Sequence, residues 1–236
     1  MPNKPANSGP LVLAHRGVSS EFPENSVAAF RAARFHGADG VELDVRRTAD
    51  HLLVVHHDAR LEDGRAIIET PSAEIPTEVP RIAEALEACG SLFVNVEIKN
   101  MPGEPDFDES NQAAAMVIEA VREAGALRRT LVSSFNLTTI DQVRTLEPSL
   151  LTGWLLFDFD PDETLRRVLD HGHGAVHPFV GRTSRAFIEA AHEVGLRVNT
   201  WTVDDPVRIE QLANDGVDGI VTNVPAVARR ALGNLA

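Results

Sequence analysis

Short apolar runs alternate with amphipathic stretches along most of the chain. Apolar runs bounded by turn residues are typical of strands, and stretches with apolar residues three and four apart are typical of helices. The pattern predicts strands over 11–15, 40–45, 52–57, 92–98, 130–134, 151–157, 175–178, 196–203 and 218–222. It predicts helices over 25–37, 80–89, 110–124, 137–146, 161–170, 184–194, 205–214 and 224–233. This alternation favours a parallel sheet with crossover helices.

One connection is too short to carry a helix. Only residues 46–51 separate the strand over 40–45 from the strand over 52–57, whereas parallel neighbours need a crossover of about a dozen residues. We therefore expect an antiparallel hairpin with its turn near 49–50, which places His57 opposite about residue 42. Without the returning strand, eight β/α units remain. The predicted fold is an α/β (β/α)8 TIM barrel with an extra β-hairpin return after the second strand.

The chain of 236 residues has the length of one such barrel. Residues 1–10 are polar and rich in proline, so we expect a flexible N-terminal tail followed by a single domain over 11–236. Either Asn25 or Ser26 is suited to be the N-cap of the first helix. The irregular segment 100–110 is acidic and follows a strand, and in barrels the loops after the strands build the active-site face.

Ionisable residues interrupt the apolar strands near their carboxyl ends. Glu42 and Asp44 share one face of their strand because successive side chains alternate faces, and Glu97 lies on a neighbouring strand. The two strands would therefore aim three carboxylates at one point, where they repel one another unless a cation or a proton is present. Oxygen ligands suit Mg²⁺ or Ca²⁺. The alternative is that each carboxylate forms an ordinary ion pair with a basic neighbour: Arg16, Arg46 or Lys99.

Two of the nine histidines, His15 and His57, end segments that lie beside the carboxylate pair. Imidazoles titrate near neutrality, so two of them across a phosphate can serve as general base and general acid. His56 should face the other way, and the role of His177, at the end of a strand, is left open. Solvated or structural positions are expected for the remaining five: His36, His51, His171, His173 and His192.

The composition limits the partners and the location. The formal net charge is −13 and no basic run is present, so nucleic acid is not an expected partner. An acidic protein repels anionic substrates at long range, so a phosphate ester would need a bound cation and local Arg or Lys. The N-terminus has no signal-peptide pattern, and the apolar runs fall short of the ~20 residues that span a bilayer. We expect a cytoplasmic protein without stable membrane insertion, and the single cysteine, Cys89, excludes an intramolecular disulfide.

Several short motifs follow one another over nearly the whole chain. They are His15-Arg16-Gly17, Pro23-Glu24-Asn25-Ser26, Gly37-Ala-Asp-Gly-Val-Glu-Leu-Asp-Val45, Val54-Val-His-His-Asp58, Asn95-Val-Glu-Ile-Lys99, Val132-Ser-Ser-Phe135, Trp201-Thr-Val203 and Gly216-Val-Asp-Gly-Ile-Val-Thr222. In this order they resemble the glycerophosphodiester phosphodiesterase family. The resemblance implies a (β/α)8 barrel that hydrolyses a small-molecule glycerophosphodiester to an alcohol and glycerol 3-phosphate.

The resemblance also implies roles for individual residues. One divalent cation, Mg²⁺ or Ca²⁺, would be held by Glu42, Asp44 and Glu97. The acid–base pair would be His15 and His57. The phosphate would contact Arg16 and Lys99, and Trp201 would line the substrate pocket.

Three positions depart from the family pattern. Leu61-Glu-Asp-Gly-Arg65 follows Asp58, His51 stands where a turn glycine is expected, and Asn223 follows Thr222 where Asp is common. None of these positions belongs to the metal or histidine set, but the segment after His57 should border the leaving-group pocket. The alcohol headgroup therefore does not follow from the sequence. The sequence does not give the oligomeric state either.

Two other functions compete with glycerophosphodiester hydrolysis. A lysophospholipase D-like activity on lysolipids needs an apolar entrance, and it is disfavoured by an aromatic content of 5% and by the lack of an amphipathic basic helix. A barrel that binds a phosphorylated ligand without turnover is disfavoured because both candidate catalytic histidines are present.

Overall fold

The computed structural model describes residues 9–233. These residues form nine strands: β1 (Leu11–His15), β2 (Gly40–Arg47), β3 (Leu53–Val55), β4 (Phe93–Ile98), β5 (Thr130–Ser134), β6 (Leu151–Leu156), β7 (Ala175–Pro178), β8 (Arg197–Thr200) and β9 (Gly219–Thr222). Eight are parallel neighbours in the order β1-β9-β8-β7-β6-β5-β4-β2, and a β1–β2 pairing closes the ring. β3 pairs antiparallel with β2 outside the ring. The predicted barrel with its extra hairpin strand is confirmed.

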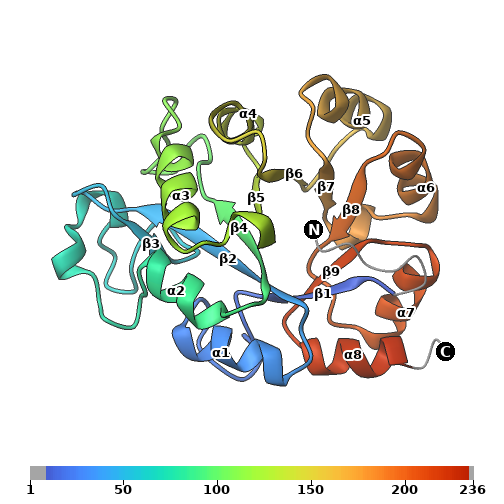
Figure 1. Ribbon diagram of the computed structural model, residues 1–236, viewed down its shortest axis with the longest axis horizontal. Coiled ribbons are helices and arrows are strands. Elements are labelled where there is room, and N and C mark those ends of the chain that lie inside the picture. Colours follow the sequence, from blue (N-terminus) through green and yellow to red (C-terminus); the bar gives the residue numbers. More distant parts are fainter. Residues whose placement is uncertain (1–8, 234–236) are drawn as a thin grey trace.

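Helices connect successive strands of the ring. Over residues 9–233 they are α1 (Val27–Phe35), α2 (Ile82–Cys89), α3 (Gln112–Glu123), α4 (Leu137–Leu146), α5 (Pro161–Asp170), α6 (Arg185–Glu193), α7 (Pro206–Asn214) and α8 (Pro225–Gly233). Figure 1 shows them surrounding the strands, with β3 and the segment after it at the periphery, beyond α2. Ser26, not Asn25, caps α1, because its hydroxyl accepts a hydrogen bond from the Ala29 N–H.

Alternation along the strands gives the barrel interior an apolar floor and a polar mouth. Leu11 and Leu13 point into the barrel and pack with Phe93, whereas the intervening Val12 packs outside the ring against the helices. His15 continues the inward face beyond Leu13. The interior is therefore apolar at the amino ends of the strands and polar at their carboxyl ends.

The hairpin differs from its prediction by one residue of register. Val45 pairs with Val55 and Arg47 with Leu53, so the expectation that His57 lies opposite about residue 42 is off by one residue. Continued pairing would bring it opposite residue 43, but β3 ends at Val55. His51 in the turn has a φ of 57°, in the left-handed region that favours glycine. The turn therefore keeps the glycine-type geometry although it lacks the expected glycine.

Most of the predicted N-terminal tail falls on residues 1–8, which lie outside the described part of the chain. Of the remaining two tail positions, Gly9 is exposed and Pro10 is buried. The single domain over 11–236 stays a prediction. Among residues 9–233, no helix is both long enough and apolar enough to cross a bilayer.

Candidate active site

A cavity of about 190 Å³ opens at the carboxyl ends of the strands. Seven of the eight predicted site residues border it: His15, Arg16, Glu42, His57, Glu97, Lys99 and Trp201. The eighth, Asp44, is 1% exposed and lies behind Arg16 and Lys99, which its carboxylate contacts. The sequence predicted no site role for the other lining residues: Asn95, Phe135, Leu155, His177 and Val221.

The strand register brings the three carboxylates together. Asp44 on β2 pairs with Glu97 on β4, two positions along from the pairing of Glu42 with Asn95. One oxygen each from Glu42, Asp44 and Glu97 lies within 4.8 Å of the other two. Oxygen ligands lie about 2.0–2.6 Å from Mg²⁺ or Ca²⁺, so this spacing lets one cation contact all three carboxylates.

Asp44 is the most strongly compensated of the three carboxylates. Lys99 Nζ and Arg16 Nε each lie 3.3 Å from its oxygens, and the Asn25 amide donates a hydrogen bond to it at 2.8 Å. Burial by itself would raise the pKa of Asp44. The positive charges of Lys99 and Arg16 outweigh burial and lower that pKa to about 2, so Asp44 is ionised at neutral pH.

Glu42 and Glu97 lack this degree of compensation. Burial and the charge of Asp44 raise the pKa of Glu42 well above its usual value. Burial also raises the pKa of Glu97, although Lys99 Nζ lies 2.8 Å from its carboxylate. Glu42 Oε1 is buried without a hydrogen-bond partner, which is costly. Ordinary ion pairs therefore account for Asp44 and Glu97 but not for Glu42. The unpartnered Glu42 oxygen lies in a donor set made only of oxygens, and such a set fits a divalent cation.

Asn223 fixes the orientation of His15. The Asn223 amide Nδ2 donates to the Asp204 carboxylate at 2.7 Å, so its Oδ1 faces His15 Nδ1 at 2.8 Å and accepts the Nδ1–H. His15 Nε2 is left facing the cavity, 3.9 Å from Glu42. Burial, and then the charge of Arg16, lowers the pKa of His15, so its neutral form prevails at neutral pH. Asn223, which stands where the family pattern commonly has Asp, thus contacts and orients a predicted site residue.

His57 is oriented in a similar way by its neighbour in sequence. Its Nδ1 lies 2.7 Å from Asp58 Oδ1 and donates to it, so Nε2 faces the cavity. Burial, and then the charge of Lys99, lowers the pKa of His57. His56 does not line the cavity, and its Nδ1 lies 2.9 Å from the Asp58 carbonyl. The different placement of the two adjacent histidines agrees with the prediction, despite the shift in hairpin register.

The turn after β1 holds Arg16 against three acidic groups. The φ of Arg16 is 55°, which is uncommon for a residue with a side chain. The Arg16 backbone N–H donates to the Glu42 carboxylate at 3.0 Å. The guanidinium reaches Glu24 at 2.8 Å as well as Asp44. A Cβ on Gly17 would lie 2.6 Å from the Cβ of Ala29, so glycine is required where α1 packs against this turn.

Arg46 links two loops beside the cavity. The side chain is 1% exposed and does not contact the cavity carboxylates. Its Nη1 donates to Asp106 at 2.7 Å and to Glu104 at 3.0 Å, while its Nε donates to the His57 carbonyl at 2.8 Å. Arg46 therefore ties the acidic loop between β4 and α3 to the segment that carries His57. The sequence showed that this loop is acidic, but it did not show that Arg46 is the partner of the loop.

Four aromatic residues gather on one side of the cavity, which we call the aromatic rim: Phe135, Phe157, Phe179 and Trp201. Trp201 lies at centroid distances of 5.5 Å from Phe135 and 5.6 Å from Phe179. Phe157 stacks near Phe179 and is 60% exposed. The aromatic content of 5%, which by itself disfavours an apolar entrance, still yields an aromatic cluster, because each rim residue comes from the end of a different strand, β5 to β8.

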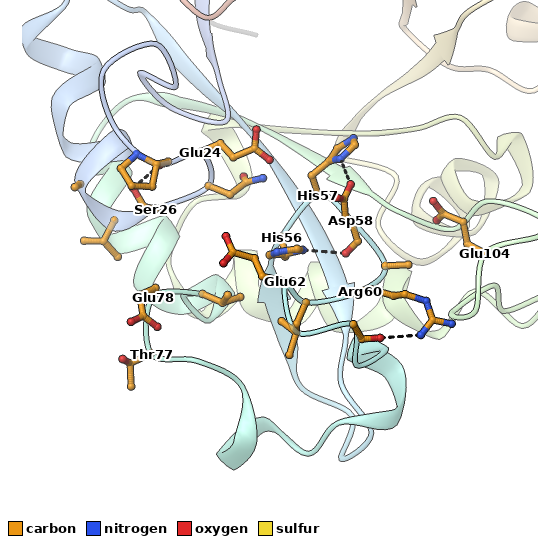
Figure 2. A pocket seen from close by; sticks show the side chains of 18 residues that line it. Glu24, Ser26, His56, His57, Asp58, Arg60, Glu62, Thr77, Glu78 and Glu104 are labelled. Atoms are coloured by element: carbon orange, nitrogen blue, oxygen red, sulfur yellow. Dashed lines mark hydrogen bonds and ion pairs between the residues drawn. The ribbon is translucent and has the colours of Figure 1, made fainter.

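An acidic groove adjoins the cavity on the side of β3. Its carboxylates are Glu24, Asp58, Glu62, Glu78 and Glu104, and Arg60 is its basic side chain. Figure 2 shows His57 among the residues that line this groove, so the same imidazole borders both the groove and the cavity. Arg60 donates to the Gly64 carbonyl at 2.9 Å. The groove therefore carries an excess of negative charge next to a predicted catalytic residue.

A family model, described as the glycerophosphoryl diester phosphodiesterase family, matches residues 15–227. The match includes the whole cavity lining. The chain belongs to the glycerophosphoryl diester phosphodiesterase family. Membership confirms the resemblance seen in the sequence, and with it the predicted class of enzyme, a phosphoric diester hydrolase.

Relatives of this phosphodiesterase match over nearly their full length. A glycerophosphodiester phosphodiesterase of Caldanaerobacter subterraneus subsp. tengcongensis is 32% identical, with 91% of this chain and 94% of the relative covered. A glycerophosphodiester phosphodiesterase structure from Parabacteroides distasonis has a TM-score of 0.86 at 26% identity, covering 97% and 98% of the two chains. An Oleispira antarctica phosphodiesterase, solved with the product sn-glycerol-3-phosphate, has a TM-score of 0.87 at 24% identity, covering 95% and 97%.

Replacing Arg46 by Met should destabilise the phosphodiesterase and lower its activity. The change leaves Asp106 buried without its cation and removes the donor to the His57 carbonyl. Removing one partner of a buried ion pair costs about 3–5 kcal/mol. Urea unfolding should show a fall of this order in the free energy of unfolding.

Arg65→Met is the matched control. Arg65 pairs with exposed Asp63 and Glu74, and pairs of this kind contribute about 0–1 kcal/mol. Equal losses of stability in the two variants would show that Arg46 has no special structural role.

Proposed function

We propose that this phosphodiesterase hydrolyses glycerophosphodiesters to an alcohol and glycerol 3-phosphate, using one divalent cation and two histidines. The observation that carries the proposal is the convergence of three buried carboxylates and two cavity-facing imidazoles around one small cavity. The name of the Caldanaerobacter relative and the product bound to the Oleispira enzyme support the same substrate class. A cytoplasmic location and the lack of a nucleic-acid partner stay part of the proposal.

In this proposal the cation, Mg²⁺ or Ca²⁺, is held by Glu42, Asp44 and Glu97. When bound, it supplies positive charge that stabilises the phosphoryl oxygens. Arg16 and Lys99 contact the phosphate, since both border the cavity and both lie beside Asp44. Three carboxylates against these two basic side chains leave an excess of negative charge, which disfavours an anionic substrate until a dication is added.

The two histidines divide the proton transfers. The glycerol 2-hydroxyl attacks phosphorus as the P–O bond to the alcohol breaks, and His15 Nε2 takes the hydroxyl proton. Holding the nucleophile within the substrate next to phosphorus contributes up to ~7–11 kcal/mol in the best cases. His57 Nε2 protonates the departing alcohol, and the Asp58 carboxylate stabilises its imidazolium form. Water then opens the cyclic phosphate as the histidines exchange roles.

The acidic groove supports a cationic alcohol as the leaving group. It is lined in part by His57, the residue to which we assign protonation of the alcohol. Its exposed carboxylates would attract an ammonium or trimethylammonium group and would repel an anionic one. Choline or ethanolamine diesters are therefore the proposed substrates.

The aromatic rim favours a second candidate function, the lysophospholipase D-like activity on lysolipids. A lysolipid carries an acyl chain on its glycerol and keeps the same headgroup as leaving group. Phe157 offers exposed apolar surface beside the cavity for such a chain. Comparing rates on micellar lysophosphatidylcholine and on soluble glycerophosphocholine separates the two functions.

Removal of the divalent cation should abolish hydrolysis, because the cavity cluster loses the charge that offsets its carboxylates. Release of glycerol 3-phosphate from glycerophosphocholine, measured before and after chelation, should fall to background and recover with Mg²⁺ or Ca²⁺. Glu42→Gln and Glu97→Gln should bind the cation at least ~10–100-fold more weakly by calorimetry, the loss typical even of outer partners of a metal. Asp63→Asn, on an exposed turn, is the control. Full activity after exhaustive chelation would refute the proposal.

His15→Ala and His57→Ala should each lower kcat by ~10²–10⁴-fold with a much smaller change in KM, because general acid–base catalysis is typically worth that much. His56→Ala is the adjacent control and should retain most activity. Steady-state kinetics with glycerophosphocholine gives both parameters. A larger loss for His56→Ala would reverse the assignment of the two histidines.

The identity of the nucleophile has its own control substrate. A diester in which hydrogen replaces the glycerol 2-hydroxyl should bind normally but react orders of magnitude more slowly. Comparable turnover would mean that water attacks directly.

Cationic headgroups should be preferred over neutral ones at low salt. We expect kcat/KM for glycerophosphocholine to exceed that for glycerophosphoglycerol by on the order of 10-fold, or ~1.4 kcal/mol, and the ratio should shrink as salt screens the groove. The double variant E62Q/E78Q should reduce the ratio. The control E123Q/E193Q changes the same charge on the outer helices α3 and α6. An equal ratio in both double variants would exclude the groove as the source of selectivity.

A further inference from the structure

A second group of metal-ligating side chains lies away from the cavity, at the other end of the barrel. Asp141 comes from α4, and His171 and His173 come from the connection between α5 and β7. One ligand atom of each lies within 4.8 Å of the other two. His173 contacts Thr152 near the start of β6, whereas Leu155 near the end of the same strand lines the cavity. Figure 1 shows α4 and α5 as neighbours on the outside of the ring.

The two histidines share one carboxylate. His171 Nδ1 lies 2.9 Å from Asp141 Oδ1, and His173 Nε2 lies 3.0 Å from the same oxygen. The imidazole rings are stacked at an interplanar angle of 21°. Ligands of a tetrahedral zinc ion lie about 2.0–2.1 Å from the metal, and hence roughly 3.3 Å from one another. The two nitrogen–oxygen distances are therefore close to those of a bound ion, and the two nitrogens lie within 4.8 Å of each other.

His173 has the outer hydrogen bond that metal-ligating histidines almost always make. The residue is 3% exposed, and its Nδ1 lies 2.8 Å from Thr152 Oγ1. Without a metal, Nε2–H donates to Asp141 and Nδ1 accepts from the hydroxyl. With a cation on Nε2, the hydroxyl can instead accept Nδ1–H, since it is both a donor and an acceptor.

We propose that Asp141, His171 and His173 bind one transition-metal dication of the Zn²⁺, Co²⁺ or Ni²⁺ type, with water completing the coordination. Two imidazoles and a carboxylate suit these ions, in contrast to the all-oxygen cluster of the cavity. Asp141 and His171 border a surface groove with Arg144 and Asp170. The ion can therefore enter from solvent. The negative charge of Asp170 offsets the positive charge of Arg144, which would otherwise repel a cation.

The bound ion would cross-link parts of the chain that are otherwise joined by hydrogen bonds. It would fix α4 to the connection between α5 and β7, and through Thr152 to β6. An ion that binds only the folded chain stabilises it by mass action. The site is thus proposed to be structural, and it is independent of the phosphodiesterase mechanism.

The experiment separates this site from the cavity cluster. The chain is titrated with Co²⁺ in the E42Q/E97Q background, which disables the cavity cluster, and binding is followed by calorimetry and by the visible absorption of coordinated Co²⁺. We expect one equivalent to bind. Adding H171A should weaken binding at least 10-fold, and Zn²⁺ should raise the thermal midpoint of E42Q/E97Q but not that of E42Q/E97Q/H171A.

His192→Ala is the matched control. His192 Nε2 makes a comparable contact with an exposed carboxylate, 2.8 Å from Asp218, but it belongs to no cluster of three ligands among the described residues. Its loss should leave Co²⁺ binding unchanged. Either the absence of a bound equivalent in E42Q/E97Q, or equal affinities with and without H171A, would overturn the proposal.

Discussion

The organisation of the active site depends on repulsion among three carboxylates that the strand register buries in one place. The β2–β4 pairing fixes their separation, since it sets Asp44 beside Glu97 and Glu42 two residues away. The surrounding side chains relieve this repulsion unequally. Asp44 receives two cations and an amide donor, whereas Glu42 keeps a buried oxygen without a partner. The uncompensated charge stays at the cavity, where a dication and a phosphate are proposed to meet.

The same problem of positioning recurs for the two histidines, and it is solved by contacts outside the cavity. Each imidazole is held at Nδ1 by a side chain, Asn223 for His15 and Asp58 for His57. Both therefore present Nε2 inward. Arg46 adds a backbone anchor for His57, and its charge is balanced by the acidic loop rather than by the cavity carboxylates. Orientation and charge are thus supplied by different residues.

The two sides of the cavity differ in chemistry because different loops build them. The groove side is acidic. It is formed mainly by residues 23–28, which lead into α1, and by the segment that follows the extra strand β3. The other side is formed by the ends of β5 to β8, and it carries the aromatic rim. In the proposed function, a phosphodiester bound between them would place one substituent in each environment. This asymmetry is the basis for the proposed order of the substrate in the cavity.

The sequence by itself determined the features that depend on local periodicity. Alternation of strands and helices gives the barrel, the short connection over 46–51 gives the hairpin, and the period of two places Glu42 and Asp44 on one inward face. Only the tertiary structure decided which distant residues meet. Asn223 lies 208 residues from His15, the acidic partners of Arg46 lie on a later loop, and the aromatic rim is collected from four strand ends. These contacts depend on closure of the ring and on loop conformation, and neither leaves a periodic signal in the sequence.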